Sequence, residues 1–331
     1  MADILRRARR IIYRNSKLVR YYWLKSEWAK RRESMNISDI DFAQMHYKKA
    51  TGKELNLINP VTYDDKLWYL KLSNRDPLLT KCSDKYLARE YVKECGLGHI
   101  LNELYGVYDN ADKIDFDKLP SPCFLKCNHA SGYNAIYDRS KPFDRRDFRR
   151  RFNFALTQNY YMVTREWNYK DIKPLIICER VLEDPGSGVG IVDFRFFCFG
   201  GVAKLINVCI GTSGEDGTHS KDGTKNTYDI DFNMLNLTIK KEKHFPPELV
   251  PKPSNLDIMR NYAEILSKPF PHCRVDLYNI DGKIYFGEMT FNSGGACTDI
   301  HPQEWSVKMG NWIDLKGYTI LPEALNTTNR H

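Results

Sequence analysis

The chain has 331 residues, 42% of them hydrophobic, which is enough to bury a sizeable core and to form two or three subdomains. No apolar run approaches the roughly 20 residues of a membrane-spanning helix, and arginines interrupt every apolar stretch near the start, which excludes a secretory signal. The nine cysteines include no Cys-x-x-Cys pair, so the spacing of a zinc site is absent. Reduced, buried thiols in a cytoplasmic protein are expected.

The net charge of +8 comes from the first 33 residues, which hold eleven basic and three acidic side chains, while the remainder is neutral. Apolar residues at helical spacing predict a basic amphipathic helix over residues 1–33. Three interpretations stay open. The helix packs on the body of the protein or on a partner, or it lies on an anionic membrane surface at the inner face of the cytoplasmic membrane. Nucleic-acid binding is disfavoured, because the rest of the chain offers no basic face.

The next stretch is predicted to be mainly helical. Residues 34–80 form a helical connector, and a further helix starts at Ser83, capped by Ser83 or Asp84, and ends at Gly96 or Gly98. A strand is expected within 100–110, two strands flanking a loop within 122–137, and helices over 142–170.

The second half is richer in predicted strands. A buried strand within 174–184 breaks at its acidic end, and residues 192–210 read as two strands joined by a Gly200-Gly201 hairpin. A polar loop follows over 211–226, then a helix over 256–266 and a hairpin over 272–291. Neither G-x-x-x-x-G-K-[ST] nor G-x-G-x-x-G occurs, so a nucleotide site would have to be built in another way.

The final hairpin carries the clearest chemistry. In "CRVDLY" the side chains of Arg274 and Asp276 share one face, and on the return strand Glu288, Thr290 and Asn292 share a face. Two carboxylates and an amide on one sheet face form an oxygen ligand set suited to Mg²⁺. The alternative is a cross-strand Arg274–Glu288 pair that binds no metal.

Whether the carboxylates meet depends on the turn. A two-residue Asp281-Gly282 turn would place them on opposite faces. A three-residue turn over 280–282, which "NIDGK" favours, pairs Asn279 with Lys283 and makes Asp276 and Glu288 diagonal neighbours.

A lysine ends the strand before the loop at 128–134. In "FLKCNHASGYN", Lys126 is a point charge suited to phosphate, and the loop can lend backbone N–H groups to phosphate oxygens. The alternative is a surface lysine beside an ordinary loop.

The order of these segments resembles the ATP-grasp superfamily. The phrases "RDPLLTKCSDKY", "FLKCNHASGYN", "REWNYKDIKP" and "GKIYFGEMTF" resemble most closely its TupA-like branch, over roughly residues 58–315. The resemblance implies an α+β ATP-grasp fold in which two sheet-containing lobes hold ATP between them. The expected organisation is a basic helix over 1–33, a connector over 34–80, an ATP-grasp domain over 81–315 with a small lobe at 120–180 and a large lobe at 181–315, and a tail over 316–331.

The resemblance also implies roles for individual residues. In the nucleotide site, Lys85 and Lys126 bind phosphates under the loop of 128–134, Glu179 begins the hinge beneath adenine, and Lys225 is a further phosphate or substrate contact. The remaining implied ATP-binding residues are His129, Ser131, Gly132, Arg180, Val181, Glu183 and Asp184, of which the main chain of Arg180 and Val181 reads the base and the two acids hold the ribose.

For catalysis, the resemblance implies that Arg274 and, more loosely, Arg195 stabilise developing charge. Asp276 and Glu288 are the implied magnesium ligands. Where the superfamily usually has Glu-x-Asn, Thr290 follows Glu288 here, so Thr290 or Asn292 is the candidate third ligand.

The implied activity is that of an ATP-dependent carboxylate–amine ligase using ATP and Mg²⁺. Its expected substrates are a carboxylate and an amine on a uronic acid or amino acid of a bacterial surface polysaccharide or its lipid-linked precursor. The alternatives are a sugar kinase or glycosyl-transfer protein on the same scaffold, and a non-catalytic nucleotide-binding component of a glycan assembly complex. The expected location is cytoplasmic, with the membrane surface as the alternative, and no nucleic-acid partner is expected.

Overall fold

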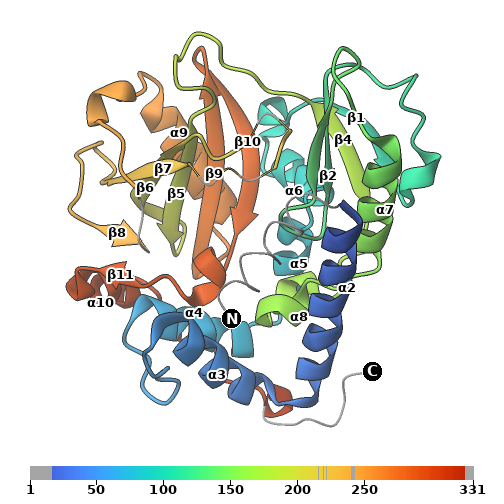
Figure 1. Cartoon of the computed structure of the whole chain (residues 1–331). Helices are drawn as coiled ribbons and strands as arrows, with labels where there is room; N and C mark the ends of the chain where they lie inside the picture. Colours follow the sequence, from blue (N-terminus) through green and yellow to red (C-terminus); the bar gives the residue numbers. More distant parts are fainter. Residues whose placement is uncertain (1–16, 215, 219, 221, 240–242, 325–331) are drawn as a thin grey trace, which may run out of the picture.

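Two antiparallel sheets, each with its own apolar core, organise the computed structural model (Figure 1). The structure describes residues 17–214, 216–218, 220, 222–239 and 243–324. Between the sheets and around them lie the helices α2 (Lys17–Glu33), α3 (Asp39–Thr51), α4 (Tyr63–Ser73), α5 (Pro77–Ser83), α6 (Ala88–Glu94), α7 (Arg145–Leu156), α8 (Tyr161–Thr164), α9 (Leu256–Ser267) and α10 (Gln303–Asn311). The expected α+β class is confirmed.

The smaller sheet has the strand order β1-β4-β2-β3 and consists of β1 (Leu104–Tyr108), β2 (Cys123–Cys127), β3 (Asn134–Tyr137) and β4 (Ile176–Arg180). Along β2 every second side chain is fully buried, and these residues form one core with Phe148 and Phe152 of α7. The alternate side chains Phe124 and Lys126 lie on the opposite face and are half-buried. Because β1 belongs to this sheet, the small lobe starts earlier in the chain than the expected residue 120.

The larger sheet has the order β10-β9-β5-β6-β7 and consists of β5 (Asp193–Phe199), β6 (Val202–Ile210), β7 (Thr224–Tyr228), β9 (His272–Ile280) and β10 (Lys283–Thr290). One face, with Phe194 and Phe196, packs on α9 through Met259 and Ala263. The prediction of a loop over 211–226 is wrong for its last residues, because they belong to β7, which pairs with β6. A separate two-stranded sheet joins β8 (Thr238–Ile239) and β11 (Ile300–His301).

The other face of the larger sheet is apolar at one end of the strands and polar at the other. Its apolar end, with Phe197 and Phe199, shares a core with Leu67 and Trp68 of α4. The predicted connector over 34–80 is therefore helical as expected, and it covers part of this sheet. Only the polar end of the face, beginning at Asp193 and Arg195, is left for a site.

The helix expected from Ser83 is divided in two. The carboxylate of Asp84 accepts the backbone N–H groups of Tyr86 and Leu87 at 2.8 and 3.3 Å, so α5 ends at Ser83 and α6 begins at Ala88. Asp84 accepts hydrogen bonds as the sequence predicted, but it does so in the turn between α5 and α6, where the half-buried Lys85 lies.

The N-terminal helix packs on the small lobe along one stripe. In α2, Trp28 is 3% exposed and the ring of Tyr21 meets Phe154 of α7 edge-on, with their centroids 5.5 Å apart. Leu18 and Tyr22 stay exposed on another face. Packing on the body is thus found for residues 17–33, while residues 1–16 of the predicted helix lie outside the described part of the chain.

A β-bulge sets the register of the final hairpin. The turn is the two-residue Asp281-Gly282 turn, with φ of 48° and 78°, and Ile280 pairs with Lys283, so the expected three-residue turn is wrong. The register then shifts at Gly287, and Glu288 stands directly opposite Asp276. The carboxylates therefore share a face in spite of the turn, and they are closer than the predicted diagonal arrangement.

Gly287 is required at the bulge by a close approach of the main chain. A Cβ at this position would lie 2.9 Å from the backbone oxygen of Asp276. Because that neighbour is main chain within a ladder, it cannot move aside without displacing a strand.

Candidate active site

A row of polar side chains crosses all five strands of the larger sheet. In register from β7 to β10 it contains Thr227, Asn207, Arg195, Asp276 and Glu288. Side chains directly opposite each other on adjacent strands point to the same face. The strand register thus places the predicted Arg195, Asp276 and Glu288 side by side, although they are 93 residues apart at the extremes.

Arg274 joins the two carboxylates. Its guanidinium donates two hydrogen bonds to Asp276, at 2.7 and 2.6 Å, and one to Glu288 at 3.2 Å. Arg195 lies behind this pair, 3.7 Å from Asp276 and 2.7 Å from Asp193. The cross-strand Arg274–Glu288 pair, which was the alternative to a metal site, is therefore present. Arg274 also binds Asp276, so one guanidinium joins both carboxylates.

The charges at this centre alter the acidity of the two carboxyl groups in opposite directions. Burial, with help from the neighbouring Asp193, raises the pKa of Asp276 to about 6 against the pull of Arg274. Burial also opposes ionisation of Glu288, but Lys85 and Arg274 prevail and hold its pKa below the ordinary value. Glu288 is therefore the carboxylate that stays charged most readily.

Two lysines approach the same centre, Lys85 from the segment between α5 and α6 and Lys126 from β2 of the small sheet. The ammonium of Lys85 donates to the backbone oxygen of Ala130 at 3.1 Å and lies 4.0 Å from the Glu288 carboxylate. Lys126 lies 2.8 Å from Glu179, and its charge helps to lower the pKa of Glu288. Lysines of two different segments thus face the carboxylates of the larger sheet.

Glu179 is held by two cations. Besides Lys126, Arg89 of α6 lies 3.2 Å from its other oxygen and also donates to the backbone oxygen of Asn102 at 2.7 Å. The Glu179 side chain is 7% exposed, so its charge is compensated almost entirely by protein. The sequence reasoning missed Arg89, although it follows Lys85 by four residues.

The loop of 128–134 is fixed at its base and exposed at its tip. His129 is 2% exposed, and its Nε2 lies 3.1 Å from the backbone oxygen of Ala155, so its side chain points into the small lobe. Ser131 and Gly132 are exposed. A contact between His129 and phosphate stays a prediction. Because the imidazole is buried and bonded to Ala155, this contact would have to come from the main chain of His129.

The predicted hinge follows β4, where the chain passes from the small sheet toward the large one. The N–H of Arg180 donates to Glu103 and its C=O accepts from Asn102, so the expected reading of a base by the Arg180 main chain is not supported. In the described part of the chain, the main chain of Val181 has no such partner. Glu183 is exposed and Asp184 half-buried, which keeps both open for a ribose.

Of the remaining predicted residues, one lies beside the carboxylate pair and the others do not. The Thr290 hydroxyl lies 3.4 Å from Glu288, next to the carboxylate pair. Asn292 turns instead toward Glu166 and Asn168, at 3.4 and 3.5 Å, so the structure does not bring it to Asp276. Lys225 lies in β7 rather than in the predicted loop.

The oxygen atoms at this centre fit a magnesium ion. Asp276 and Glu288 are directly opposed, and the Oδ1 atom of Asp193 is buried without a hydrogen-bond partner. Among the described residues no cluster of three or more His, Cys, Asp or Glu side chains is found. Two carboxylates suffice for Mg²⁺ when phosphates and water complete its coordination.

Comparisons with known proteins agree with this geometry. A family model described as "TupA-like ATPgrasp" matches residues 65–314. No curated protein sequence is significantly similar to the chain.

Among solved structures, an L-amino acid ligase from Bacillus licheniformis matches with a TM-score of 0.41 and 13% identity, covering 66% of this chain and 45% of that one. A D-alanine–D-alanine ligase from Helicobacter pylori gives 0.41 and 13%, covering 78% and 68%. A D-alanine–D-alanine ligase from Bacillus anthracis, complexed with ATP, gives 0.37 and 11%, covering 71% and 67%. The chain thus spans less than half the length of the first of these proteins.

Proposed function

The chain belongs to the TupA-like ATP-grasp family, and from this membership we propose that it is an ATP-dependent carboxylate–amine ligase. The predicted resemblance and the predicted ATP-grasp fold are thereby confirmed. We also propose the division into a helical N-terminal part, up to residue 80, and an ATP-grasp domain over 81–315.

One observation carries the proposal. The opposed carboxylates of Asp276 and Glu288 are joined by Arg274 and face Lys85, which lies 4.0 Å from Glu288. Phosphoryl transfer requires acids that can hold a divalent cation, a cation that can meet developing charge and a lysine that can bind phosphate.

The residues divide the work as follows. Asp276 and Glu288 would hold Mg²⁺, which when bound would neutralise charge on the ATP phosphates. Lys85, before α6, and Lys126, in the small sheet, bind phosphate oxygens, and loop 128–134 covers them. Arg274 stabilises the negative charge that develops as the substrate carboxylate attacks the γ-phosphorus and ADP leaves. An amine then attacks the acyl carbon, phosphate leaves, and the nitrogen loses a proton to give the amide.

The proposed substrates are a uronic acid or amino acid of a bacterial surface polysaccharide, or of its lipid-linked precursor. This part rests on the family membership and on the basic N-terminal segment. In the described part of the chain, no helix is long and apolar enough to cross a membrane.

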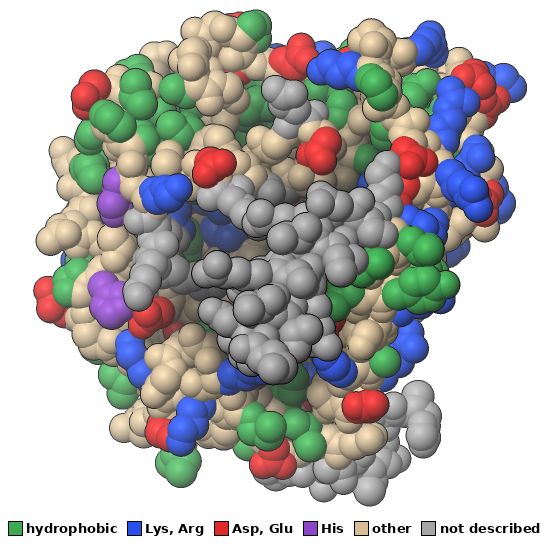
Figure 2. Space-filling view, in the orientation of Figure 1, with side chains coloured by type: hydrophobic (Ala, Val, Ile, Leu, Met, Phe, Trp, Pro, Cys, Tyr) green, Lys and Arg blue, Asp and Glu red, His purple; other side chains and the backbone are tan. Residues whose placement is uncertain are grey.

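A surface contact would bring the enzyme to lipid-linked precursors. The exposed face of α2 carries Leu18, Tyr22 and Lys25, spaced by four and three residues and therefore on one stripe. Figure 2 shows Lys and Arg side chains, interspersed with carboxylates, along the side of the small lobe where α2 and α7 lie. An apolar stripe flanked by basic residues suits an anionic membrane surface.

An ADP-release screen tests the activity. Amino acids and uronic acids are supplied in pairs with MgATP, and the products are weighed by mass spectrometry. ADP formation that needs both a carboxylate and an amine, with an amide product, is expected. A stable phosphorylated sugar formed without amine would indicate a kinase, and ATP binding without turnover would indicate a non-catalytic component.

The variant Asp276→Asn should lower the rate of ADP release by at least about 100-fold, because it removes charge from the metal ligand set. Asp257→Asn on α9 is the control, since Asp257 is 82% exposed and pairs with Arg260. Equal activity of Asp276→Asn and the wild type would contradict the proposed metal site.

The membrane proposal has its own test. Binding to liposomes with anionic lipid should fall at least about fivefold in the variant Leu18→Ser/Tyr22→Ser/Lys25→Gln, while binding to neutral liposomes stays low for both proteins. The matched control is Lys48→Gln on α3, another exposed lysine. Unchanged binding of the triple variant would exclude this stripe as the contact.

A further inference from the structure

One arginine lies on the side of α2 that faces the protein. Tyr21, Leu24, Trp28 and Arg31 follow one another at helical spacing, and this stripe packs on the small lobe, with Trp28 buried and the other three half-buried. The exposed stripe that is proposed to meet a membrane lies on another face of the helix. Arg31 thus brings a positive charge to the inner side of α2, beside α8 (Figure 1).

The guanidinium of Arg31 is held by an aromatic ring. Its central carbon lies 4.6 Å from the ring centroid of Trp28, which is 3% exposed and therefore a fixed support. In the described part of the chain, no carboxylate oxygen lies within 4.0 Å of this guanidinium, and it has no hydrogen-bond partner. The adjacent Arg32, by contrast, donates to the side chain of Gln158 at 3.2 Å. The N–H groups of Arg31 are thus positioned but still available to a ligand.

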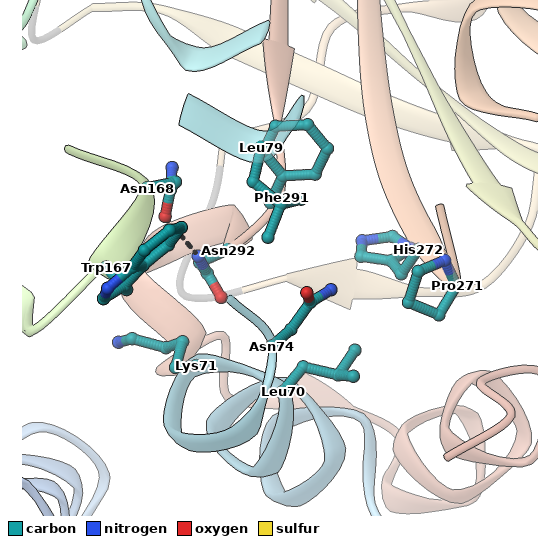
Figure 3. Close-up of a pocket in the computed structure, with 10 residues that line it drawn as sticks. All are labelled: Leu70, Lys71, Asn74, Leu79, Trp167, Asn168, Pro271, His272, Phe291 and Asn292. Atoms are coloured by element: carbon teal, nitrogen blue, oxygen red, sulfur yellow. Dashed lines mark hydrogen bonds between the residues drawn. The ribbon is translucent and has the colours of Figure 1, made fainter. Parts of the chain in front are cut away.

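The other cations around the site have partners inside the protein. Most of them lie within 4.0 Å of a carboxylate, namely Lys85, Lys126, Arg89, Arg195 and Arg274. Lys71 donates to the backbone oxygen of Gly295 at 3.0 Å, and Figure 3 shows its ammonium pointing out of the small cavity that it lines. That cavity has a volume of about 20 Å³, enough for one water molecule. Among the described cations of this region, Arg31 therefore stands out as a donor for an anion from outside the protein.

Two tyrosines connect Arg31 with the nucleotide loop and with the reaction centre. Burial raises the pKa of Tyr133, in the loop of 128–134, and Trp28 and Arg31 oppose this rise. Burial also raises the pKa of Tyr160, to about 12, where Arg31 again opposes the rise and Glu288 adds to it. Because Tyr160 interacts with both the guanidinium and the proposed metal ligand Glu288, an extended substrate that reacts at the metal can reach Arg31 with a second group.

The chemistry of a guanidinium defines that second group. Its planar fork binds a carboxylate or a phosphate through two parallel hydrogen bonds. Both groups occur in the proposed substrates. An amino-acid acceptor keeps a carboxylate that does not react, and a lipid-linked sugar carries phosphate between the sugar and its lipid.

We propose that Arg31 binds an anionic group of the substrate, a carboxylate or a phosphate remote from the reacting carboxylate, and that Trp28 holds its guanidinium in place. This inference rests on the proposed ligase function for its role in turnover. The family model begins at residue 65, so α2 lies outside the matched domain. The N-terminal segment therefore contributes to the selection of the substrate, in addition to its proposed contact with a membrane.

Acetate and methyl phosphate are the probes, and they require no knowledge of the substrate. Thermal unfolding of the full-length chain, with saturating MgADP, is compared in sodium acetate, sodium methyl phosphate and sodium chloride at matched ionic strength. At least one of the two anions should raise the Tm of the wild type on the order of 2 °C more than chloride does. The anion that does so shows whether the site takes carboxylate or phosphate.

The variant Arg31→Gln should lose this extra rise in Tm. Lys30→Gln is the matched control, because it removes the same charge from the same helix at a side chain that is 66% exposed and pairs with Glu27. It should keep the extra rise. A wild type in which neither anion exceeds chloride would overturn the proposal, and so would an undiminished rise in Arg31→Gln.

Chemical labelling tests the wild type without any substitution. Phenylglyoxal modifies accessible guanidinium groups, and mass spectrometry of the peptides measures the rate at each arginine. The anion identified above should slow the labelling of Arg31 at least about fivefold and leave that of the exposed Arg146 unchanged. Equal rates with and without the anion at Arg31 would contradict the proposal even if Arg31→Gln does not fold.

In the ADP-release assay, Arg31→Gln should raise the KM of one substrate at least about tenfold and leave the KM of ATP unchanged. The substrate affected identifies the source of the anionic group. An equal loss with ATP and with both substrates would show a structural role and overturn the proposal. Absence of ADP release from the wild type would refute the proposed ligase function, while the anion probes and the labelling would still test Arg31.

Discussion

At the scale of single residues, the site is built from charges that compensate one another across elements. Glu179 of β4 lies between Lys126 of β2 and Arg89 of α6, and all three side chains are at most 16% exposed. Such a buried group of charges is favourable only while every member has its partner. Lys126, for which phosphate binding is proposed, is thus held in place by Glu179, and Glu179 is held from the other side by Arg89.

Glu179→Gln should therefore destabilise the fold by about 3 kcal/mol, because Lys126 and Arg89 would remain buried without a negative partner. Urea unfolding provides the measurement. Glu94→Gln, which breaks an exposed pair with Lys81, is the control and should change the free energy of unfolding by less than about 0.5 kcal/mol. Equal effects of the two variants would contradict this account.

Two buried histidines predict how stability depends on pH. Burial lowers the pKa of His129 to about 4 and that of His272 to about 3. In the unfolded chain a histidine has a pKa of about 6.5, so on acidification the unfolded state binds protons first. Stability is fully present above pH 6.5, and it falls as the pH decreases toward 4.

Each of these histidines should account for a loss on the order of 2 kcal/mol between pH 7 and pH 5. Urea titrations at both pH values measure this, and His129→Gln/His272→Gln should show a smaller decrease than the wild type. The exposed His99→Gln is the control. A double variant with the same decrease as the wild type would refute the assignment.

The sequence predicted individual residues where chemistry is local to a strand or loop. Lys126 could be named because the order of segments around it resembles the ATP-grasp superfamily, whereas the lysine and its loop alone left a surface lysine as the alternative. Arg89 and Asp193 were missed, because each acts through a partner that is distant in sequence or in a neighbouring strand. Asn292 was assigned to the metal from its spacing alone, and the chain turns it toward Glu166 as soon as β10 ends.

At the scale of elements, the bulge in β10 decides whether Asp276 and Glu288, the proposed metal ligands, meet. Strands and helices were predicted in nearly the right order, because hydrophobic periodicity reports them directly. The register between β9 and β10 was not predicted correctly. It depends on the bulge, and the bulge depends on the close approach of the Gly287 backbone to that of Asp276, which no local sequence pattern encodes. The turn sequence favoured a three-residue turn, but the hairpin has a two-residue turn. The register shift at Gly287 compensates for this difference and brings Glu288 opposite Asp276.

Gly287→Ala should displace β10 from β9, lower stability by about 1–3 kcal/mol and weaken MgADP binding at least about tenfold. Gly282→Ala is the matched control. That residue also has a positive φ, of 78°, but its Cβ would meet nothing within 4 Å. It should lose about 1 kcal/mol and keep MgADP affinity. Calorimetric titration with MgADP and urea unfolding separate the two effects.

At the scale of the whole molecule, the lobes meet through a loop that reaches from one sheet to the other. The segment between β6 and β7 extends to the small sheet, where the N–H of Ile136 in β3 donates to the backbone oxygen of Asp216 at 2.9 Å. A Cβ on Gly217 would lie 2.9 Å from the ring of Phe124. The sequence predicted two lobes, but their contact depends on this long-range approach and was not foreseen.

Gly217→Ala should loosen this contact and increase the rate of amide hydrogen exchange at Ile136 at least about tenfold, because the added methyl group cannot fit against Phe124. Gly188→Ala is the control. Its φ of 68° is also positive, and its Cβ would meet nothing within 4 Å. Protection of Ile136 that is unchanged in Gly217→Ala would show that the loop contact is not what shields this amide.

The same loop has a consequence for solubility. β3 is an edge strand of the small sheet, and an edge with free N–H and C=O groups can pair with the edge of another molecule. By accepting the N–H of Ile136, Asp216 covers part of that edge from within the chain. A movement of the lobes that broke this contact would uncover a template for self-association, so a saturating nucleotide that holds the lobes together should slow the aggregation of concentrated protein.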